Sequence, residues 1–460
     1  MSGKRISGKL IVLLALAILS ADANGQLAPG NSTLTVTTNA DLPNGSCQFL
    51  SSTCSLRAAI IFANSLPPRV RYGSVVTIQL PALATGNEYL LQILGQNEGW
   101  AWTGDLDVQS HIVINGGGKA DTIINAIGIS ERVFEIQPGW SLTLSGVTVK
   151  GGRVQNPAKD IGGGILIQRD QYSAGNLVLV DSDVTDNTIV DSRVGGGIGN
   201  FGNATLIRSR IFKNSSDIGG GGIYNGPYGN LTITDTTIDN NSAINTGGGL
   251  YNVGAVTADR STFNDNSARR GGGVFHTGNA LTLTNSTISG NKALFADGGG
   301  LFSSSGFTLF HVTAAFNTSG VQTGTPTALY MSGVSAVATL KNSLISEPGK
   351  AACGFYLGST ISQGYNLEDG NRCGLDPSKG DVNTFYVGLG PLASNGGFTQ
   401  THALLPGSFR FPNPAIDRIP TGCAGCLPAD QRGVARPSGY GIDIGAFEYE
   451  QFPILQPWPF

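Results

Sequence analysis

Few residues in this chain have side chains suited to catalysis, and three of them stand close together. Arg269 and Arg270 lie shortly before His276. A base next to cations that neutralise a carboxylate is what elimination on an acidic polysaccharide requires. These three residues are therefore candidate catalytic residues. The alternative is that His276 replaces another polar residue at a solvated turn, which is the interpretation we favour.

Aspartates recur through the middle of the chain, and we place Asp181, Asp235 and Asp259 in one column of a repeat. If that column crosses neighbouring strands, carboxylates on adjacent strands lie roughly 5 Å apart. Such a cluster would suit a ligand-binding site, a Ca²⁺ site or the paired carboxylates of an inverting glycosidase. Aspartate is also a default turn residue, and we favour that interpretation. The expected cofactor is therefore none, or Ca²⁺.

Residues 197–202 (GIGNFG) match the glycine spacing of a dinucleotide-binding loop. That loop functions between a strand and a helix, and no such pattern surrounds these residues. We interpret the glycines as a corner of the repeat instead.

The repeat itself is marked by asparagine, which recurs at intervals of 27, 27, 25, 25 and 26 residues. The six positions are Asn187, Asn214, Asn241, Asn266, Asn291 and Asn317. In the unit that ends at Asn187, the apolar residues are Leu177, Leu179 and Val184, and the later units follow the same pattern. A spacing of two puts the first pair on one face of a strand, and the longer step allows a corner.

Triple glycines form a second marker, and an apolar residue follows each of them. They begin at Gly162, Gly195, Gly220, Gly247, Gly271 and Gly298. Glycine permits the positive φ and the close backbone approach that a sharp corner needs. A period of about 25 residues with these features predicts an all-β solenoid, a single-stranded parallel β-helix. Asparagines stacked at one turn would hydrogen-bond along its axis.

Both ends of the chain depart from the repeat. Residues 54–64 have the pattern of a short amphipathic helix that would cap the N-terminal end. We divide the chain into a signal peptide (1–23), an N-terminal cap with irregular coils (24–110), the β-helix (111–348), a C-terminal cap domain (349–450) and a tail (451–460).

Composition and the N-terminus point to export. Lys4, Arg5 and Lys9 precede an apolar run at 10–19, and small residues at 21–23 suit cleavage. That run is too short to span a bilayer well, and no later segment is apolar enough, so we expect no transmembrane segment in the mature chain. The formal net charge is −3, with only 13% charged residues, which argues against nucleic-acid binding.

The six cysteines also suit an oxidising compartment. We expect three local disulfides that pin the two ends of the chain, while Cys423 and Cys426 have the spacing of a redox or zinc motif as an alternative. The expected pairs are Cys47 with Cys54, Cys353 with Cys373, and Cys423 with Cys426.

Several motifs resemble a known family. Residues 54–60 (CSLRAAI) are similar to the N-terminal motif of bacterial exported right-handed parallel β-helix proteins, which usually has Glu where Ala58 stands. Residues 401–408 (THALLPGS) and 443–448 (DIGAFE) resemble the choice-of-anchor Q domain. The resemblance implies a right-handed β-helix, and this family has no common established activity. We interpret Arg432 and Asp443, which lie in the second motif region, as an ion pair.

These observations favour an exported or cell-surface protein, a monomer, that binds a polysaccharide or a cell-surface component. The alternative is a carbohydrate-active enzyme, a polysaccharide lyase or a glycoside hydrolase of the pectate-lyase-like superfamily. No catalytic sequence run of the polygalacturonase type occurs, which favours binding. A fold of this kind does not by itself decide between them.

Overall fold

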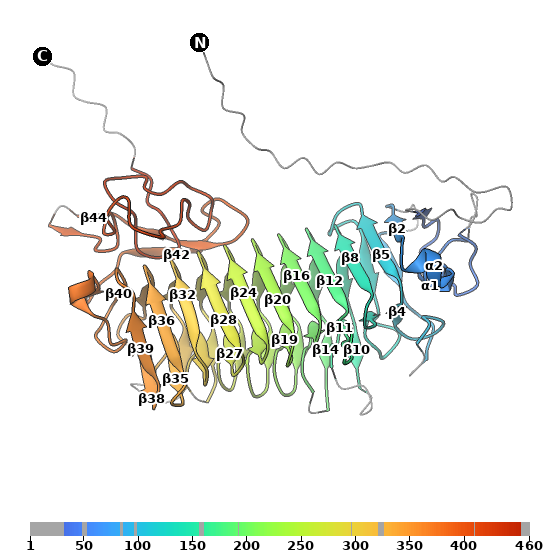
Figure 1. The fold of residues 1–460 in the computed structure, drawn as a ribbon, viewed down its shortest axis with the longest axis horizontal. Helices are drawn as coiled ribbons and strands as arrows, with labels where there is room; N and C mark the ends of the chain where they lie inside the picture. The colour runs from blue at the N-terminus through green and yellow to red at the C-terminus, as the bar shows by residue number, and fades with distance from the viewer. Residues whose placement is uncertain are drawn as a thin grey trace, which may run out of the picture.

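A computed structural model describes residues 32–47, 53–82, 86–95, 99–155, 161–191, 193–295, 297–320, 326–408 and 410–451. Its body is a right-handed parallel β-helix, in which successive turns of the chain stack along one axis (Figure 1). The predicted all-β solenoid is therefore confirmed. The expected signal peptide and nearly all of the expected tail lie outside the described residues.

Each regular turn passes through a front sheet, a second sheet, a small sheet and a third sheet in that order. The front sheet consists of β1 (Ser32–Thr35), β2 (Val75–Leu80), β5 (His111–Gly116), β8 (Ser141–Ser145), β12 (Asn176–Val180), β16 (Asn203–Ile207), β20 (Asn230–Thr234), β24 (Ala255–Asp259), β28 (Ala280–Thr284), β32 (Phe307–Phe310), β36 (Val337–Lys341) and β39 (Ser359–Ser362). All of its described neighbours pair in parallel, so like residues stack on like residues along the axis.

The second sheet follows the front sheet around a corner. It consists of β3 (Glu88–Leu90), β6 (Ile123–Asn125), β9 (Thr148–Lys150), β13 (Asp183–Thr185), β17 (Arg210–Phe212), β21 (Thr237–Asp239), β25 (Thr262–Asn264), β29 (Thr287–Ser289), β33 (Thr313–Ala315), β37 (Leu344–Ser346), β40 (Leu367–Glu368) and β41 (Val382–Asn383). The small sheet consists of β10 (Arg153–Val154), β14 (Thr188–Ile189), β18 (Ser215–Ser216), β22 (Ser242–Ala243), β26 (Ser267–Ala268), β30 (Lys292–Ala293) and β34 (Thr318–Ser319).

The third sheet closes each turn before the chain returns to the front. It consists of β4 (Leu106–Val108), β7 (Phe134–Ile136), β11 (Ile165–Ile167), β15 (Ile198–Asn200), β19 (Ile223–Asn225), β23 (Leu250–Asn252), β27 (Val274–His276), β31 (Leu301–Ser303), β35 (Leu329–Ser332) and β38 (Cys353–Tyr356). Strand pairing thus begins before residue 111 and continues past residue 348, so the stacked sheets are longer than the β-helix segment expected from the sequence.

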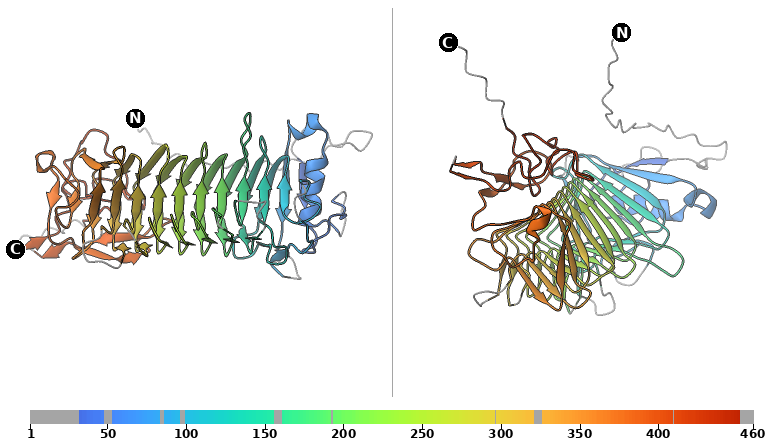
Figure 2. Two further views of the ribbon diagram at one scale, coloured as in Figure 1. Left: turned by 90° about the horizontal axis from the view of Figure 1, so that it is seen from below. Right: turned by 60° about the vertical axis from the view of Figure 1, so that its left-hand side comes forward.

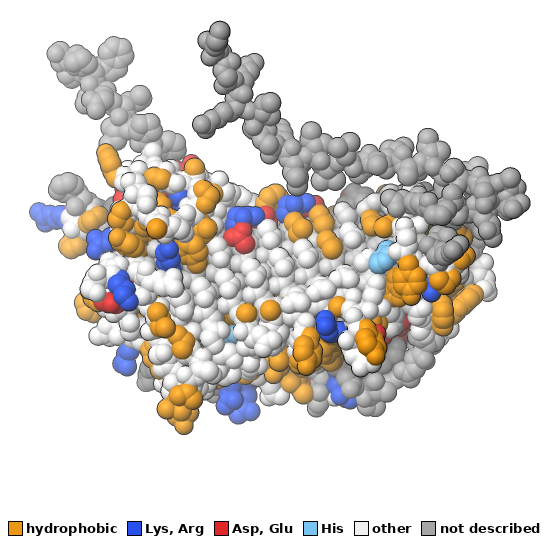
Figure 3. Space-filling view, viewed as in Figure 1, with side chains coloured by type: hydrophobic (Ala, Val, Ile, Leu, Met, Phe, Trp, Pro, Cys, Tyr) orange, Lys and Arg blue, Asp and Glu red, His pale blue; other side chains and the backbone are white. Residues whose placement is uncertain are grey.

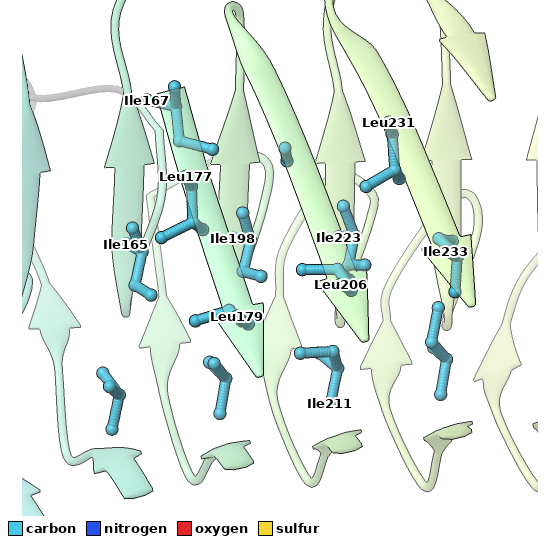
Figure 4. Close-up of a cluster of buried hydrophobic side chains, with 14 of the residues drawn as sticks. Ile165, Ile167, Leu177, Leu179, Ile198, Leu206, Ile211, Ile223, Leu231 and Ile233 are labelled. Carbon is cyan, nitrogen blue, oxygen red and sulfur yellow. The ribbon is translucent and has the colours of Figure 1, made fainter. Parts of the chain in front are cut away.

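The core is a set of aliphatic columns that run the length of the solenoid. Leu177 and Leu179 of β12 are buried, and they align with Ala204 and Leu206 of β16. Figure 4 shows the side chains of Leu177, Leu179 and Leu206 pointing inward from the front sheet toward those of the other sheets. Burying an aliphatic side chain contributes about 1.5–3 kcal/mol, and the repeat supplies such residues in every regular turn.

A ladder of buried asparagines runs beside this core, as predicted. The side-chain amide of Asn214 donates to the Oδ1 of Asn241 at 3.1 Å, and its other donor bond goes to the carbonyl of Val184 at 2.9 Å. The backbone N–H of Asn214 donates to the same Oδ1 at 3.0 Å. The same bonds recur from Asn187 to Asn317, so buried amides that would be costly alone are satisfied by one another.

The triple glycines and the asparagines belong to one corner. Gly220, the first of its triplet, has φ +63, a conformation that side chains rarely adopt. A Cβ on Gly222, the third, would lie 2.9 Å from the amide carbon of Asn241 and 2.6 Å from the carbonyl oxygen of Gly249. The two markers seen in the sequence therefore recur together because the asparagine occupies the space that a third side chain would need.

Helix α1 (Leu56–Ser65) lies at the N-terminal end of the solenoid, and the short helix α2 (Pro68–Arg71) follows it (Figure 2). Ser55 caps α1 by accepting from the backbone N–H of Ala58. Arg57 is fully buried and forms a two-bond ion pair with Asp41. The helix buries its apolar residues over the first coil, which covers strand ends that would otherwise face water.

The C-terminal region, residues 384–451, folds back over one side of the solenoid (Figure 1). It contains the pairs β42 (Leu389–Ala393) with β43 (Thr401–Leu404) and β44 (Gly407–Ser408) with β45 (Phe411–Pro412); the 3-10 helix η1 (Pro377–Lys379) precedes it. The structure contains the disulfides Cys47–Cys54, Cys353–Cys373 and Cys423–Cys426, which are the pairs expected from the sequence.

Candidate functional site

The corner between the front sheet and the second sheet carries a column of charged residues. In four successive turns the residue at this corner is Asp181, Arg208, Asp235 and then Arg260, and each has a positive φ near +50. A left-handed residue lets the chain leave the front strand and turn at once toward the second sheet. The column therefore alternates acid and base, and it directs the side chains outward at the bend.

This register corrects the sequence interpretation that placed Asp181, Asp235 and Asp259 in one column. Asp259 is the last residue of β24 and aligns with Thr234, one residue before the corner. Asp181 and Asp235 do share the corner position, but Arg208 stands between them. Asp235 and Asp259 are on adjacent turns but one residue out of register, and Arg260 bonds to both of them.

The alternating charges bond to one another along the axis. Arg208 donates to both carboxylate oxygens of Asp181, at 2.8 and 2.7 Å. Arg260 does the same to Asp235, at 2.8 and 3.0 Å, and also donates to Asp259. Paired, two-bond contacts between a guanidinium and a carboxylate hold both groups in a fixed orientation.

A parallel row of charges lies on the second sheet. Arg210 donates to both carboxylate oxygens of Asp239, at 2.7 and 2.6 Å, and Lys119 pairs with Asp183 at 2.8 Å. Acidic and basic side chains are seen side by side along the upper edge of the front sheet in Figure 3, next to the C-terminal region. The corner is thus rich in charge and close to neutral overall.

These two rows line a cavity of about 450 Å³, which we call the corner groove. The C-terminal region contributes Phe398, whose ring is 67% exposed and lies 5.7 Å from the guanidinium of Arg208. The groove is lined by Gly118, Lys119, Gly146, Asp181, Arg208, Ser209, Arg210, Asp235, Thr237 and Phe398. An exposed aromatic ring beside fixed hydrogen-bonding groups suits a ligand with both apolar and hydroxyl faces.

The ion pairs determine the protonation of the groove. The hydrogen bonds that Arg208 donates to Asp181 raise the pKa of Arg208, and those that Arg260 donates to Asp235 raise the pKa of Arg260. Burial raises the pKa of Asp259, against the lowering effect of Arg260. The arginines therefore stay protonated, and they act as hydrogen-bond donors rather than as bases.

The expected Ca²⁺ does not fit these residues. The carboxylate oxygens of Asp181 and Asp235 already accept bonds from guanidinium groups, so they are not free to bind a cation. Within the part of the chain that the structure describes, no group of three or more His, Cys, Asp or Glu residues is arranged to hold a metal ion.

His276 lies in β27 with its side chain buried, so neither interpretation made from the sequence describes it correctly. It stands in a second ladder, where Asn200 donates to Asn225 and Asn225 to Asn252. The Nδ2 of Asn252 lies 3.0 Å from the Nδ1 of His276, whose Nε2 lies 3.1 Å from the carbonyl oxygen of Gly306. Burial lowers the pKa of His276, so it is a neutral link in the ladder, shielded from any substrate.

Arg269 and Arg270 are both exposed, whereas the ring of His276 is buried. The guanidinium of Arg270 lies 6.0 Å from the ring of Phe302, and its charge acts on Asp297. The structure therefore does not bring the three candidate catalytic residues together into a site with a base.

Phe302 belongs to an aromatic column on the outside of the third sheet that the sequence interpretation missed. Successive ring centroids along the column are 4.9 to 5.9 Å apart. The rings are those of Phe201, Tyr224, Tyr251, Phe275, Phe302 and Tyr330. Most of them stand two residues after a triple glycine, a periodic signal that was available in the sequence.

A second cavity, of about 530 Å³, lies at the corner between the third sheet and the front sheet; we call it the tyrosine pocket. Its most exposed aromatic ring belongs to Tyr228, at 72%, and the guanidinium of Arg169 lies 5.7 Å from that ring. The pocket is lined by Arg169, Asp170, Gln171, Phe201, Pro227 and Tyr228.

Polar contacts hold the C-terminal region, and with it Phe398, against the second sheet. Gln431 donates to the hydroxyls of Thr262 and Thr399 at 2.9 Å and accepts from Thr287 at 2.7 Å. Arg432 pairs with Asp430 at 2.8 Å, which corrects the expected pair with Asp443. Asp443 instead accepts bonds from the backbone N–H groups of Asp417 and Tyr449.

Comparisons with known proteins give only distant similarities. No family model and no curated protein matches the chain. Among solved structures, it is similar to the pectate lyase Pel9A, with 12% identity, a TM-score of 0.47, and coverage of 94% of this chain and 97% of that one. It is also similar to the A-module of the Azotobacter vinelandii mannuronan C-5 epimerase AlgE6, with 15% identity, a TM-score of 0.36, and coverage of 73% and 89%.

Proposed function

We propose that this protein is a secreted or cell-surface β-helix protein that binds a polysaccharide in the corner groove. The observation that carries the proposal is the exposed ring of Phe398 above the ordered Asp and Arg pairs. Sugar rings have apolar faces that stack on aromatic rings and hydroxyls that accept from and donate to fixed polar groups. The groove offers both kinds of contact side by side.

The electrostatics of the groove favour binding over the alternative, a polysaccharide lyase or a glycoside hydrolase. A lyase needs a base near the operating pH, and the groove arginines have raised pKa values. A hydrolase needs two carboxyl groups with separate roles, and the groove aspartates instead pair with arginine or lysine. The candidate base His276 is buried elsewhere.

Export to the cell exterior is part of the proposal. The disulfides suit an oxidising compartment, and no helix among the described residues is long and apolar enough to cross a membrane. The partner we propose is a polysaccharide or a cell-surface component that carries one, and a monomer suffices because one chain forms the whole groove.

The test is binding to a panel of neutral and acidic polysaccharides, measured by calorimetry for the wild type and for Phe398→Ala. We expect at least one polysaccharide to bind the wild type and the variant to bind it about tenfold more weakly, the effect of losing one stacking contact. Phe385→Ala is the matched control, because Phe385 is also exposed and lies outside the groove lining.

The same incubations are followed at the absorbance of unsaturated products and by a reducing-end assay. We expect neither signal to rise with time. Turnover of any polysaccharide would overturn the binding proposal in favour of the enzyme, and equal binding by Phe398→Ala would remove the groove as the site.

A further inference from the structure

The corner groove and the tyrosine pocket lie at opposite ends of the same two strands. β16 begins two residues after Phe201 and ends immediately before Arg208. β20 begins two residues after Tyr228 and ends immediately before Asp235. Both cavities therefore open beside one stretch of the front sheet, one at each of its edges.

The separation of the two cavities exceeds the reach of a small ligand. A five-residue strand spans about 17 Å at about 3.3 Å per residue, and the flanking corner residues add to that length. A single sugar ring therefore occupies one cavity only, whereas a chain of several rings reaches both.

The surface between the cavities is uncharged. The outward-facing residues of the two strands are Asn203, Thr205, Ile207, Asn230, Thr232 and Thr234. Figure 3 shows this part of the front sheet as a pale, uncharged band with charged and hydrophobic side chains above and below it. Hydroxyl and amide groups in this setting can hydrogen-bond to the hydroxyls of a sugar chain.

Each end of this surface has an aromatic ring and balanced charges. The rings of Tyr228 and Phe398 are 72% and 67% exposed. Arg169 has Asp170 next to it in the tyrosine pocket, and the basic residues that line the corner groove are paired with aspartate. Because cations are not in excess at either end, the site lacks the positive charge that a polyanion would need.

We propose that an uncharged oligosaccharide chain lies along β16 and β20, across the solenoid axis, with one end over Tyr228 and the other against Phe398. The proposal rests on the polysaccharide-binding function proposed above and specifies the ligand class and its path. The chain thus crosses the solenoid instead of running parallel to its axis. Binding is bivalent, since a chain held at one end meets the other ring at a high effective concentration.

The test is a length series of neutral gluco- and manno-oligosaccharides, from the monosaccharide upward, with galacturonate oligomers of the same lengths. Calorimetry is run on the wild type, Phe398→Ala, Tyr228→Asn and the double variant. Asn is chosen because Tyr228 has φ +67, which asparagine tolerates. Tyr440→Ala is the control, because Tyr440 is also exposed, at 90%, and lines neither cavity.

We expect the affinity of a neutral series to be low for short chains and to rise about tenfold or more once a chain reaches both rings. Either single variant removes that rise, and the double variant loses little more, since bivalent binding fails when one end is lost. The galacturonate oligomers bind more weakly at every length. Thermal unfolding of each variant shows that the fold is intact.

Some outcomes overturn this proposal and leave the proposed function standing. If Tyr228→Asn binds the long chains like the wild type while Phe398→Ala does not, the path along the strands is wrong. If galacturonate oligomers bind more tightly than neutral ones, with affinity that falls steeply with salt, the ligand class is wrong. If no saccharide of any length binds, the proposed function fails as well.

Discussion

The carboxylate of Glu347 closes the asparagine ladder by accepting two bonds from Asn317, from the backbone N–H and from the side-chain amide, each at 2.9 Å. In the register of the second sheet, Pro348 is the residue that follows Asn317 one turn later, but the residue before it, Glu347, supplies the last acceptor. Glu347 is buried, and burial raises the pKa of its carboxyl to about 8. A ladder of neutral amides thus ends on a group that can carry charge.

This arrangement makes stability depend on pH. Because the pKa of Glu347 is higher in the folded chain than its ordinary value, the folded state binds more protons between about pH 4.5 and 8, and stability falls as pH rises through that range. We expect Glu347→Gln to remove part of this loss of unfolding free energy, on the order of 2 kcal/mol at the upper end of that pH range.

Urea unfolding at a series of pH values measures this effect. Asp107 and Asp443 also have raised pKa values and contribute to the same pH dependence. The comparison is therefore between wild type and variant in the slope of the free energy of unfolding against pH. The exposed Glu450 gives the control Glu450→Gln. Parallel wild-type and Glu347→Gln curves would show that the ladder does not end on a protonated acid.

The interior of the ladder should be sensitive to single substitutions. Asn241→Ala removes the acceptor of two Asn214 donors and leaves the carbonyl of Ile211 without its side-chain donor. Buried groups left unsatisfied cost about 1–3 kcal/mol each, so we expect a loss of about 3 kcal/mol or more in the free energy of unfolding. Asn279→Ala, at an exposed asparagine outside both ladders, should change stability by less than about 0.5 kcal/mol. Equal losses for the two variants would contradict a structural role for the ladder.

Gly222→Ala tests the steric link between the glycine triplet and the ladder. The added Cβ would lie 2.9 Å from the amide carbon of Asn241 and 2.6 Å from a backbone oxygen, so we expect destabilisation of about 1–3 kcal/mol. Gly117→Ala is the control, since its Cβ would meet only a side-chain oxygen at 3.8 Å. Differential scanning calorimetry of both variants decides, and a wild-type Tm for Gly222→Ala would refute the link.

Gln431→Ala should loosen the C-terminal region without unfolding the solenoid. Its side chain bonds to Thr262, Thr287 and Thr399, so its loss removes the acceptor of the Thr287 hydroxyl and a donor to each of the other two hydroxyls. We expect faster cleavage of residues 384–451 in limited proteolysis, with the main unfolding transition little changed. Gln400→Ala, which keeps the backbone contact of Gln400 with Thr262, should be cleaved at the wild-type rate. Equal cleavage rates for all three proteins would mean that other contacts hold this region.

The repeat made the core predictable. In a solenoid each residue stacks on its counterpart one period later, so the columns of Leu177, Leu179 and Val184 could be read from spacing alone. The inward position of His276 was readable too, because it lies two residues after the buried Val274 and so on the same strand face. The signal that was missed is that successive side chains of a strand alternate between its two faces, which applies to polar residues as much as to apolar ones.

Of the corner groove, only the charged column could be read in the same way. Its charged column alternates Asp181 with Arg208, and a search for repeated aspartates passes over every second member. Phe398 comes from a region without repeats, and its place over Arg208 depends on how that region docks on the second sheet. Contacts between non-repeating segments are set by tertiary packing, which spacing does not encode.

The ladder of asparagine side chains has a direction. From Asn187 to Asn317 every side-chain amide donates one of its bonds to the next side chain toward the C-terminal end, and the Oδ1 of Asn187 accepts from the backbone N–H of Gly152. The stacked side-chain amides therefore all have the same orientation along the solenoid axis. Because Glu347 supplies the acceptor at the C-terminal end of this row and Gly152 the donor at the N-terminal end, one chain satisfies both ends of the row by itself.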